Sequence, residues 1–239
     1  AYKKNEDLTK SIIGIYLAKP AAGKELSRTS IYHDSEAITQ GLVLTSDGWV
    51  VSYYDKFMPG GKYVAITKEG RVFPISSFLL DDFSDLTFFK LEQDIDGVVV
   101  NDFNVFKLGN SSSLNIGEEV YLLNRLGQVV YTKLKDINWD SADIATSIIK
   151  ETEQNYKFLL LSENVYNDFY GSPVLNSDGE MIGMVKYDSQ AKREMVIPIN
   201  SFASVITSLL RVGEIYRPSL GLYYLPLSKN FNLSDNIAH

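Results

Sequence analysis

The chain has 239 residues, no cysteine and only two histidines. The lack of cysteine excludes a disulfide scaffold, a thiolate zinc site and a cysteine nucleophile, and it leaves the redox compartment open. No apolar run is long enough to span a bilayer, and no signal peptide is visible. The opening stretch, AYKKNEDLTK, is typical of the start of a mature chain, which is compatible with the removal of an upstream anchor.

Positive charge is also in short supply. The 23 lysines and arginines are outnumbered by 30 aspartates and glutamates, which gives a formal net charge of -7. This balance argues against nucleic acid or an anionic membrane surface as a partner, and ordinary solubility accounts for most of it. With 45% hydrophobic and 22% charged residues, the composition favours a well-buried core over disorder or a coiled coil.

Short segments rich in β-branched and aromatic residues, separated by turn residues, extend over most of the chain. These segments predict strands at 11–18, 41–46, 49–54, 62–67, 71–75, 119–124, 128–134, 157–162, 172–177 and 180–187. Hairpin turns are expected at Asp47-Gly48, Glu69-Gly70, Leu126-Gly127 and Asp178-Gly179. Because no helices alternate with the strands, antiparallel barrels or sandwiches are favoured over a parallel sheet.

Two stretches share one pattern. GLVLTSDGWVVS (41–52) and SPVLNSDGEMIG (172–183) each place small and apolar residues before Ser-Asp-Gly and another apolar run. Two similar six-stranded halves would produce this repeat, although Ser-Asp-Gly is also a common turn. One helix is predicted over 200–213, with apolar residues along one face and a stop at Gly213.

Six segments resemble, in their order along the chain, those of the HtrA/Deg-type trypsin-like serine proteases. They are GLVLTSDGWVVS, FSDLTFFKLE (83–92), FKLGNSSSLNIGEEVYLL (106–123), DFYGSPVLNSDGEMIGM (168–184), MVIPIN (195–200) and RPSLGLYYLPL (217–227). The resemblance implies an all-β, trypsin/chymotrypsin-like double β-barrel with a C-terminal helix. We expect an N-terminal barrel at 1–100, a second barrel with the closing helix at 101–213, and a linker leading into a PDZ-like segment at 214–239.

The resemblance also implies three catalytic positions. The family uses a serine nucleophile, a histidine base and an aspartate that orients the histidine. In this sequence the aspartate position holds Asp85, the histidine position holds Asp55, and the nucleophile position holds Tyr170. Two of the three triad positions are therefore expected to be lost. We predict that Tyr170 closes the former site and directs its hydroxyl at Asp85, a mostly buried acceptor, or at Asp55.

The loop around this nucleophile position is altered as well. In the family its backbone N–H groups form the oxyanion hole, and two glycines beside the serine permit the tight geometry. Here the loop contains Asp168, Phe169, Tyr170, Gly171 and Ser172, so one of the two glycines is missing. The bulky rings are expected to occupy the space that a substrate carbonyl needs.

The two histidines do not supply a base. His33 is expected on an exposed polar loop, and His239 is the last residue of the sequence. Without a base that titrates near neutral pH, a serine hydroxyl stays protonated and is a poor nucleophile. A different choice of serine does not repair this defect.

Other candidate sites are weaker. Ser172 as a displaced nucleophile competes with its interpretation as an ordinary turn serine. The acids in 81–85 and 94–96 could bind a cation, but the spacing of a calcium loop is absent. Asp55 and Asp85 could also form an aspartic-protease pair, which needs two acids that share a water symmetrically.

The sequence therefore predicts a catalytically inactive HtrA-like homologue, a pseudoprotease that acts as a protein-binding, scaffolding or protease-regulating module. The expected partner is a protein or an extended peptide, another protease included, added as a strand beside 181–187. No cofactor, metal or nucleic acid is implied. An active hydrolase with a different constellation and a purely structural domain of an envelope assembly stay open. The resemblance alone implies a place outside the cytoplasm, with a membrane reached only through a segment absent from this chain, and it is compatible with an oligomer.

Overall fold

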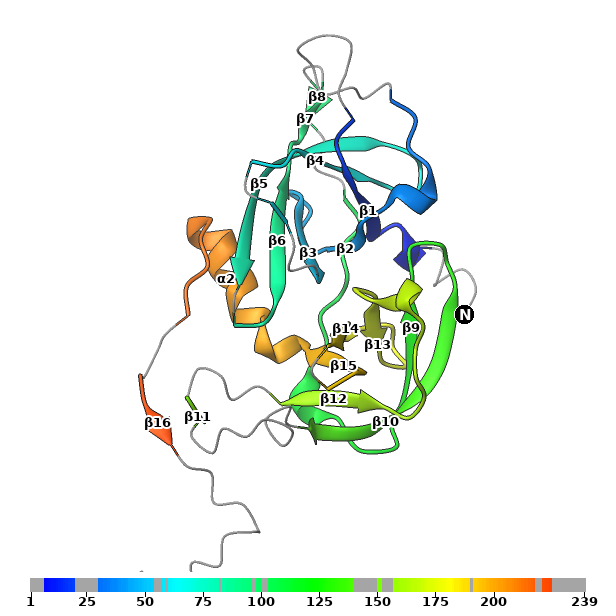
Figure 1. The fold of residues 1–239 in the computed structure, drawn as a ribbon, viewed down its shortest axis with the longest axis vertical. Helices are drawn as coiled ribbons and strands as arrows, with labels where there is room; N and C mark the ends of the chain where they lie inside the picture. The colour runs from blue at the N-terminus through cyan, green and yellow to red at the C-terminus, as the bar shows by residue number, and fades with distance from the viewer. Residues whose placement is uncertain are drawn as a thin grey trace, which may run out of the picture.

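The protein consists of two closed, six-stranded antiparallel β-barrels followed by a C-terminal helix (Figure 1). This computed structural model describes residues 7–19, 30–53, 57–58, 60–81, 83–95, 98–99, 103–139, 150–151, 157–189, 191–217 and 221–224. The double barrel and the C-terminal helix confirm the fold class predicted from the sequence.

The first barrel is built from the first six strands of the chain. They are β1 (Ile12–Leu17), β2 (Thr39–Val43), β3 (Trp49–Tyr53), β4 (Tyr63–Ile66), β5 (Val72–Asp81) and β6 (Leu86–Leu91). Around the barrel their order is β1-β2-β3-β6-β5-β4. The long β5 serves two neighbours, because it pairs first with β4 and, after an irregularity near Ile75, with β6.

The second barrel has the same strand order. Its strands are β9 (Glu119–Leu123), β10 (Val129–Trp139), β12 (Phe158–Leu161), β13 (Pro173–Leu175), β14 (Met181–Asp188) and β15 (Arg193–Pro198). They close as β10-β12-β15-β14-β13-β9, so in both barrels the sixth strand joins the third and fifth. Short elements fill the connections: η1 (Asp34–Glu36), β7 (Asp94–Ile95), β8 (Val98–Val99), η2 (Ser111–Ser113), η5 (Asn167–Phe169) and η6 (Ile199–Ser201).

The four predicted hairpin turns are present, and each contains a glycine in the left-handed region. The φ angles are 88° at Gly48, 80° at Gly70, 81° at Gly127 and 76° at Gly179. Glycine adopts this conformation without the steric cost that a β-carbon imposes. The turn residues therefore determined where one strand ends and the next begins.

The repeated Ser-Asp-Gly pattern does not mark equivalent places in the two barrels. The first copy forms the β2–β3 hairpin, which contains the second and third strands of its barrel. The second copy forms the β13–β14 hairpin, which contains the fourth and fifth strands. The two halves do have the same topology, but this repeat reflects shared turn chemistry.

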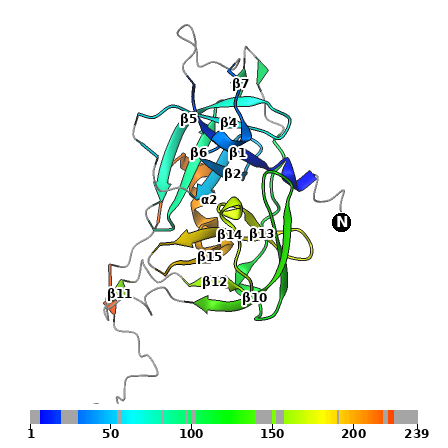
Figure 2. The same cartoon turned by 45° about the vertical axis from the view of Figure 1, so that its right-hand side comes forward.

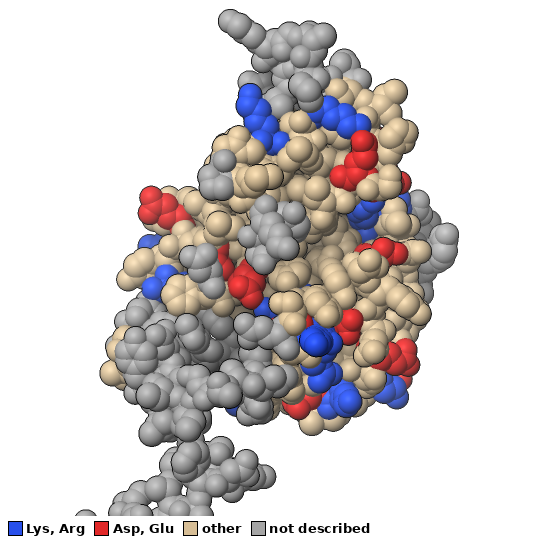
Figure 3. Space-filling model, viewed as in Figure 1, with Lys and Arg blue, Asp and Glu red and all other residues tan. Residues whose placement is uncertain are grey.

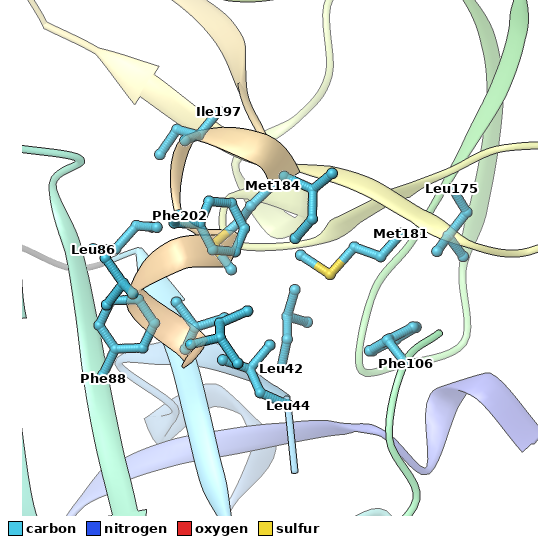
Figure 4. Close-up of a cluster of buried hydrophobic side chains, with 14 of the residues drawn as sticks. Leu42, Leu44, Leu86, Phe88, Phe106, Leu175, Met181, Met184, Ile197 and Phe202 are labelled. Carbon is cyan, nitrogen blue, oxygen red and sulfur yellow. The ribbon is translucent and has the colours of Figure 1, made fainter. Parts of the chain in front are cut away.

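The barrels meet across a shared apolar cluster, separate from the cluster inside each barrel. Figure 4 shows side chains from both barrels turned toward one another, among them Leu42 and Phe88 from barrel one and Met184 and Ile197 from barrel two. Phe202, at the start of the C-terminal helix, is fully buried in the same cluster. Burial of this surface holds the two barrels in one fixed arrangement.

The helix predicted over 200–213 is α2 (Ala203–Val212), preceded by the η6 turn. Gly213 ends it with a φ of 73°, as expected for a glycine stop. Its buried face carries Val205, Ile206 and Leu209, which pack into the inter-barrel cluster. Within the described residues, no helix is long and apolar enough to cross a membrane.

After the helix the chain turns back toward the barrels. Arg217 places its guanidinium on the buried carboxylate of Asp81 at the end of β5. Further along, β16 (Tyr223–Tyr224) pairs with β11 (Lys150–Glu151), which lies in the connection between β10 and β12 (Figure 1). Most of the stretch compared with a PDZ-like segment, 225–239 included, lies outside the described residues.

Candidate functional site

The functional candidate is the cleft between the barrels. Figure 2 shows the short yellow η5 turn at the level where the barrels meet, between β2 and β14. Beside it is a pocket of about 430 Å³ to which both barrels contribute. It is lined by Asp34, Ser35, Ala37, Ile38, Thr39, Gln40, Tyr53, Asn124, Arg125, Leu126, Asn167, Asp168 and Tyr170.

Tyr170 follows the η5 turn, and its ring packs against barrel two. The ring stacks on Tyr187 of β14, with 5.5 Å between the ring centroids and 23° between the planes. Its hydroxyl donates a hydrogen bond of 3.3 Å to Oε1 of Glu194 on β15. Burial and then the nearby Glu194 carboxylate raise the pKa of Tyr170 to about 12, because both disfavour the phenolate. Tyr170 is therefore a neutral hydrogen-bond donor at neutral pH.

The prediction that Tyr170 donates to Asp85 is wrong. Lys186 of β14 is the partner of Asp85, with 2.6 Å between Nζ and Oδ2. The side chain of Asp85 is 52% exposed, so it is not the mostly buried acceptor that the resemblance implied. The other predicted acceptor, Asp55, lies outside the described residues.

Lys186 links the two barrels. Its side chain is only 7% exposed, and its ammonium lies 5.0 Å from the ring centroid of Phe158 on β12. The charge is thus balanced by a carboxylate on one side and by an aromatic face on the other. Lys186 and Tyr187 are neighbours in β14, so this strand holds the partners of both Asp85 and Tyr170. Asp85 and Tyr170 both contact β14, but their hydrogen-bond partners are Lys186 and Glu194.

The backbone N–H groups of this loop donate hydrogen bonds to carbonyl oxygens of the protein. The Tyr170 N–H donates to the Asn167 carbonyl at 3.0 Å, and the Phe169 N–H donates to the Tyr166 carbonyl at 2.9 Å. The next amide, Gly171, donates to the Val185 carbonyl at 2.8 Å. Successive N–H groups are therefore engaged within the protein instead of pointing together at one position in the cleft.

Gln40, which is 4% exposed on β2, holds this loop against barrel one. Its Nε2 donates to the carbonyls of Asp168 and Tyr170 at 3.2 and 2.9 Å, and to Oγ of Ser172 at 3.0 Å. Its Oε1 accepts from the backbone N–H of Arg125 at 3.0 Å. One amide side chain thus fixes the loop and the β9–β10 turn together.

The other predicted loop residues have distinct environments. Phe169 is 4% exposed and belongs to the interior cluster of barrel two. Ser172 is fully buried, so its hydroxyl is not presented to the cleft. Gly171 has a φ of 80°, and a β-carbon there would stand 3.2 Å from the Gln40 carbonyl oxygen. Asp168 is exposed at the pocket.

Among the histidine and cation candidates, His33, Asp81 and Asp85 have side chains within the described part of the structure. His33 is exposed beside the η1 turn, where its backbone N–H donates to Glu36 at 2.7 Å. In the 81–85 stretch, Asp81 binds Arg217 and Asp85 binds Lys186, so both carboxylates already have cationic partners. Across the described part of the chain, no group of three or more histidine or acidic residues could hold a metal ion.

A sequence model of the "Trypsin-like peptidase domain" matches residues 30–184, more than half of the chain. The chain belongs to the trypsin-like peptidase domain family. The matched range contains β2 to β13 and the first half of β14, and with them all residues that line the pocket described above. The strand order of the two barrels and the family match agree on the same double-barrel architecture.

One curated relative in this family is "Serine protease HTRA2, mitochondrial" from Drosophila virilis. It is 26% identical over 186 residues, an alignment that covers 74% of this chain and 40% of that protein. The chain therefore spans less than half the length of the relative that it matches.

Sequence reasoning missed three residues that bind the loop or Asp85: Glu194, Gln40 and Lys186. Glu194 and Gln40 gave no sequence signal, because each reaches the loop from another strand. Lys186 did leave one: it is the only charged residue in the otherwise apolar run MIGMVK. A lone lysine within a buried strand needs a counter-charge, and that rule could have identified Asp85 as a candidate.

Proposed function

We propose that this domain has no peptidase activity and binds an extended protein segment in the cleft between its barrels. The observation that carries the first half is the conformation of the loop at the nucleophile position. Tyr170 stands there with its hydroxyl on Glu194 and its backbone N–H on the Asn167 carbonyl. A hydrolytic site needs a free nucleophile and converging N–H donors at this place.

The placement of the remaining hydroxyl and imidazole groups supports the same proposal. His33 is exposed on the η1 turn, whereas Ser172 is buried beneath the loop with its hydroxyl on Gln40. The Asp85 carboxylate is engaged by Lys186. A serine without a histidine base is a weak nucleophile, so none of these groups supplies the acyl-transfer chemistry of the family.

The test of inactivity combines an assay with a covalent probe. We expect no cleavage of unfolded casein between pH 5 and 9 and no labelling by a fluorophosphonate, with an active trypsin-like protease as the positive control. Turnover that disappears in a Ser172→Ala or an Asp85→Asn variant would show a working non-family constellation and overturn the proposal.

The second half of the proposal concerns binding. The pocket beside η5 has walls from both barrels, and pockets of a few hundred Å³ are typical ligand sites. On the face drawn in Figure 3, acidic and basic side chains are interspersed without a large field of one sign. Recognition in the cleft then depends on local contacts more than on long-range attraction.

The strand proposed for peptide addition needs a correction. Residues 181–184 of β14 pair with β13, and Gly183 and Met184 pair with β15 as well, so this part is not an edge. Among the described residues, Lys186, Tyr187 and Asp188 pair with β15 alone. The Tyr187 carbonyl also accepts from the Tyr53 hydroxyl at 2.7 Å. A bound segment would add at this short stretch after displacing that hydroxyl.

Binding can be tested with a random-peptide phage library selected on the immobilised domain. The selected peptides should shift backbone amide signals around the pocket and at 186–188. Leu126→Asp should weaken their binding, because Leu126 lines the pocket and is 53% exposed. The control Ile116→Asp changes a residue that is 65% exposed outside the pocket and should have no effect. A footprint that lies wholly on another face would refute this binding site.

A further inference from the structure

The pocket between the barrels contains a carboxylate that is not neutralised by the described part of the chain. Asp168 is exposed at the pocket, and no hydrogen bond or ion pair to another described residue holds its side chain. Only its carbonyl oxygen is engaged, by Gln40 at 3.2 Å. The acceptor oxygens of this acid are therefore available to a ligand.

The other charges that line the pocket balance each other. Arg125 donates from Nη1 to Oδ1 of Asp34 at 2.7 Å and from Nη2 to the Asp34 carbonyl at 2.6 Å. The guanidinium is thus turned toward the η1 turn, and the pair contributes little net charge. Asp168 is left as the one lining residue with an uncompensated charge among the described residues.

The lining of the pocket also includes apolar side chains. Ala37 and Ile38 come from barrel one, Leu126 comes from the β9–β10 turn, and Tyr53 and Tyr170 add aromatic rings, while polar side chains make up the rest of the lining. The volume of about 430 Å³ exceeds that of one side chain, so it accommodates a long side chain together with adjoining backbone. A pocket that combines apolar side chains with an anion matches a side chain with an aliphatic stem and a cationic tip.

We propose that this pocket recognises a lysine or arginine side chain of the bound segment, with Asp168 as its counter-charge. The aliphatic stem packs on Ile38 and Leu126, and the cationic tip reaches the carboxylate. This inference rests on the proposed binding function and specifies the chemistry of the partner at that site.

Small probes test the inference without a known partner. N-acetyl-lysine amide and N-acetyl-norleucine amide, which share a four-carbon stem, are titrated into the ¹⁵N-labelled protein, and amide shifts at 124–126 and 167–170 are followed. We expect the lysine probe to bind about three- to fivefold more tightly, the contribution of a partly exposed ion pair. The preference should shrink as salt is added.

Two variants isolate the carboxylate. Asp168→Asn keeps the shape of the side chain and should remove the preference, so that the two probes bind equally. Glu163→Gln removes the same charge from an exposed position outside the pocket and should leave the preference intact. The exposed site of each change leaves the fold unaltered, which the same amide spectra verify.

Each outcome decides the inference separately from the proposed function. The proposed lysine or arginine recognition is wrong if the two probes bind equally or cause no shifts at the pocket. It is also wrong if the lysine preference survives Asp168→Asn. Phage-selected peptides that occupy the pocket without a basic residue leave the binding function in place while removing this specificity. If the pocket prefers the lysine probe but the selected peptides bind elsewhere, the specificity of the pocket stands and the proposed peptide-binding site is refuted.

Discussion

Asp81 and Asp85 lie at the two ends of one short loop in barrel one, yet their environments are opposite. The Asp81 side chain is fully buried. It accepts hydrogen bonds from Nε and Nη2 of Arg217 and from the Ser84 hydroxyl. Asp85 is 52% exposed and receives the single ammonium of Lys186. The comparison shows that Asp85, which the sequence predicts at the catalytic aspartate position, is held by one partly exposed ion pair, whereas Asp81 is held by a buried one.

The two cations differ as well as the two acids. Arg217 comes from the segment after α2 and also donates to the Ser201 carbonyl at 3.1 Å, so it ties the chain beyond the helix to barrel one. Lys186 comes from β14 of barrel two. One pair therefore fastens the C-terminal segment, whereas the other spans the cleft.

The largest effect is expected from Arg217→Met, because it leaves the fully buried Asp81 carboxylate without its cation. Breaking a buried ion pair costs about 3–5 kcal/mol of the free energy of unfolding. Urea denaturation at neutral pH measures the loss. Arg211→Met, at an exposed position of α2, is the control and should change stability by no more than about 0.5 kcal/mol. If Arg217→Met lowers the free energy of unfolding by less than about 1 kcal/mol, the buried pair contributes no more than a partly exposed ion pair such as Asp85–Lys186.

The second prediction is an asymmetry within the Asp85–Lys186 pair. Asp85→Asn strands a lysine whose side chain is 7% exposed, which should cost about 1–3 kcal/mol. Lys186→Met leaves a carboxylate that already reaches solvent, so the loss should stay below about 1 kcal/mol. Both are measured by urea denaturation under identical conditions. Equal losses, or the opposite order, would mean that the carboxylate is the residue that depends on the pair.

The third prediction extends the comparison to Tyr170, which donates to Glu194 from barrel two's side of the cleft. Its folded-state pKa of about 12 exceeds the ordinary value of 10, so folding favours the protonated form. This contribution is intact below pH 10 and is lost as the pH rises toward 12. The stability of the native protein should therefore fall relative to Tyr170→Phe over that range.

Denaturation of both proteins at several pH values measures this difference. Tyr166→Phe, which changes the neighbouring tyrosine that is 79% exposed, is the control and should retain the alkaline fall. A constant difference between the native protein and Tyr170→Phe across the range would contradict the packing of this ring against barrel two.

The smallest effect is expected at an ion pair on the surface, between Lys107 and Glu180. The Lys107 side chain is 79% exposed, and the Glu180 carboxylate beside it raises the pKa of the lysine. Solvent screens such a pair, so Lys107→Met should not move the urea midpoint beyond the experimental error. A clear shift of the urea midpoint would show that the contributions of the three ion pairs to stability do not follow their solvent exposure.

Much of the fold could be predicted from local patterns. Ten of the strands were expected from β-branched and aromatic runs, and glycine turns divided them at the correct places. No local pattern predicted the strands β6 and β15, which were noticed only through the resemblance to the protease family. Each of them lies between the third and fifth strands of its barrel. Their role depends on pairing with strands distant in the sequence, which hydrophobic patterns do not encode.

The site was predicted less well than the fold. The sequence paired the Tyr170 hydroxyl with Asp85 or Asp55, whereas the hydroxyl donates to Glu194. It also described 181–187 as an edge, although β13 and β15 cover its first half. These errors share one cause, since each concerns which neighbour stands beside a residue after the barrels have closed.

The sequence by itself determined the chemistry that is available: no cysteine, a tyrosine where the resemblance implies the nucleophile, and glycines where the chain must turn. Only the tertiary structure decided which groups meet. Asp85 and Lys186 are 101 positions apart, and Asp81 and Arg217 are 136 apart. Barrel closure and the packing of α2 across both barrels bring these groups within hydrogen-bonding distance. Contacts at such separations depend on the whole fold, because no local pattern in the chain specifies their geometry.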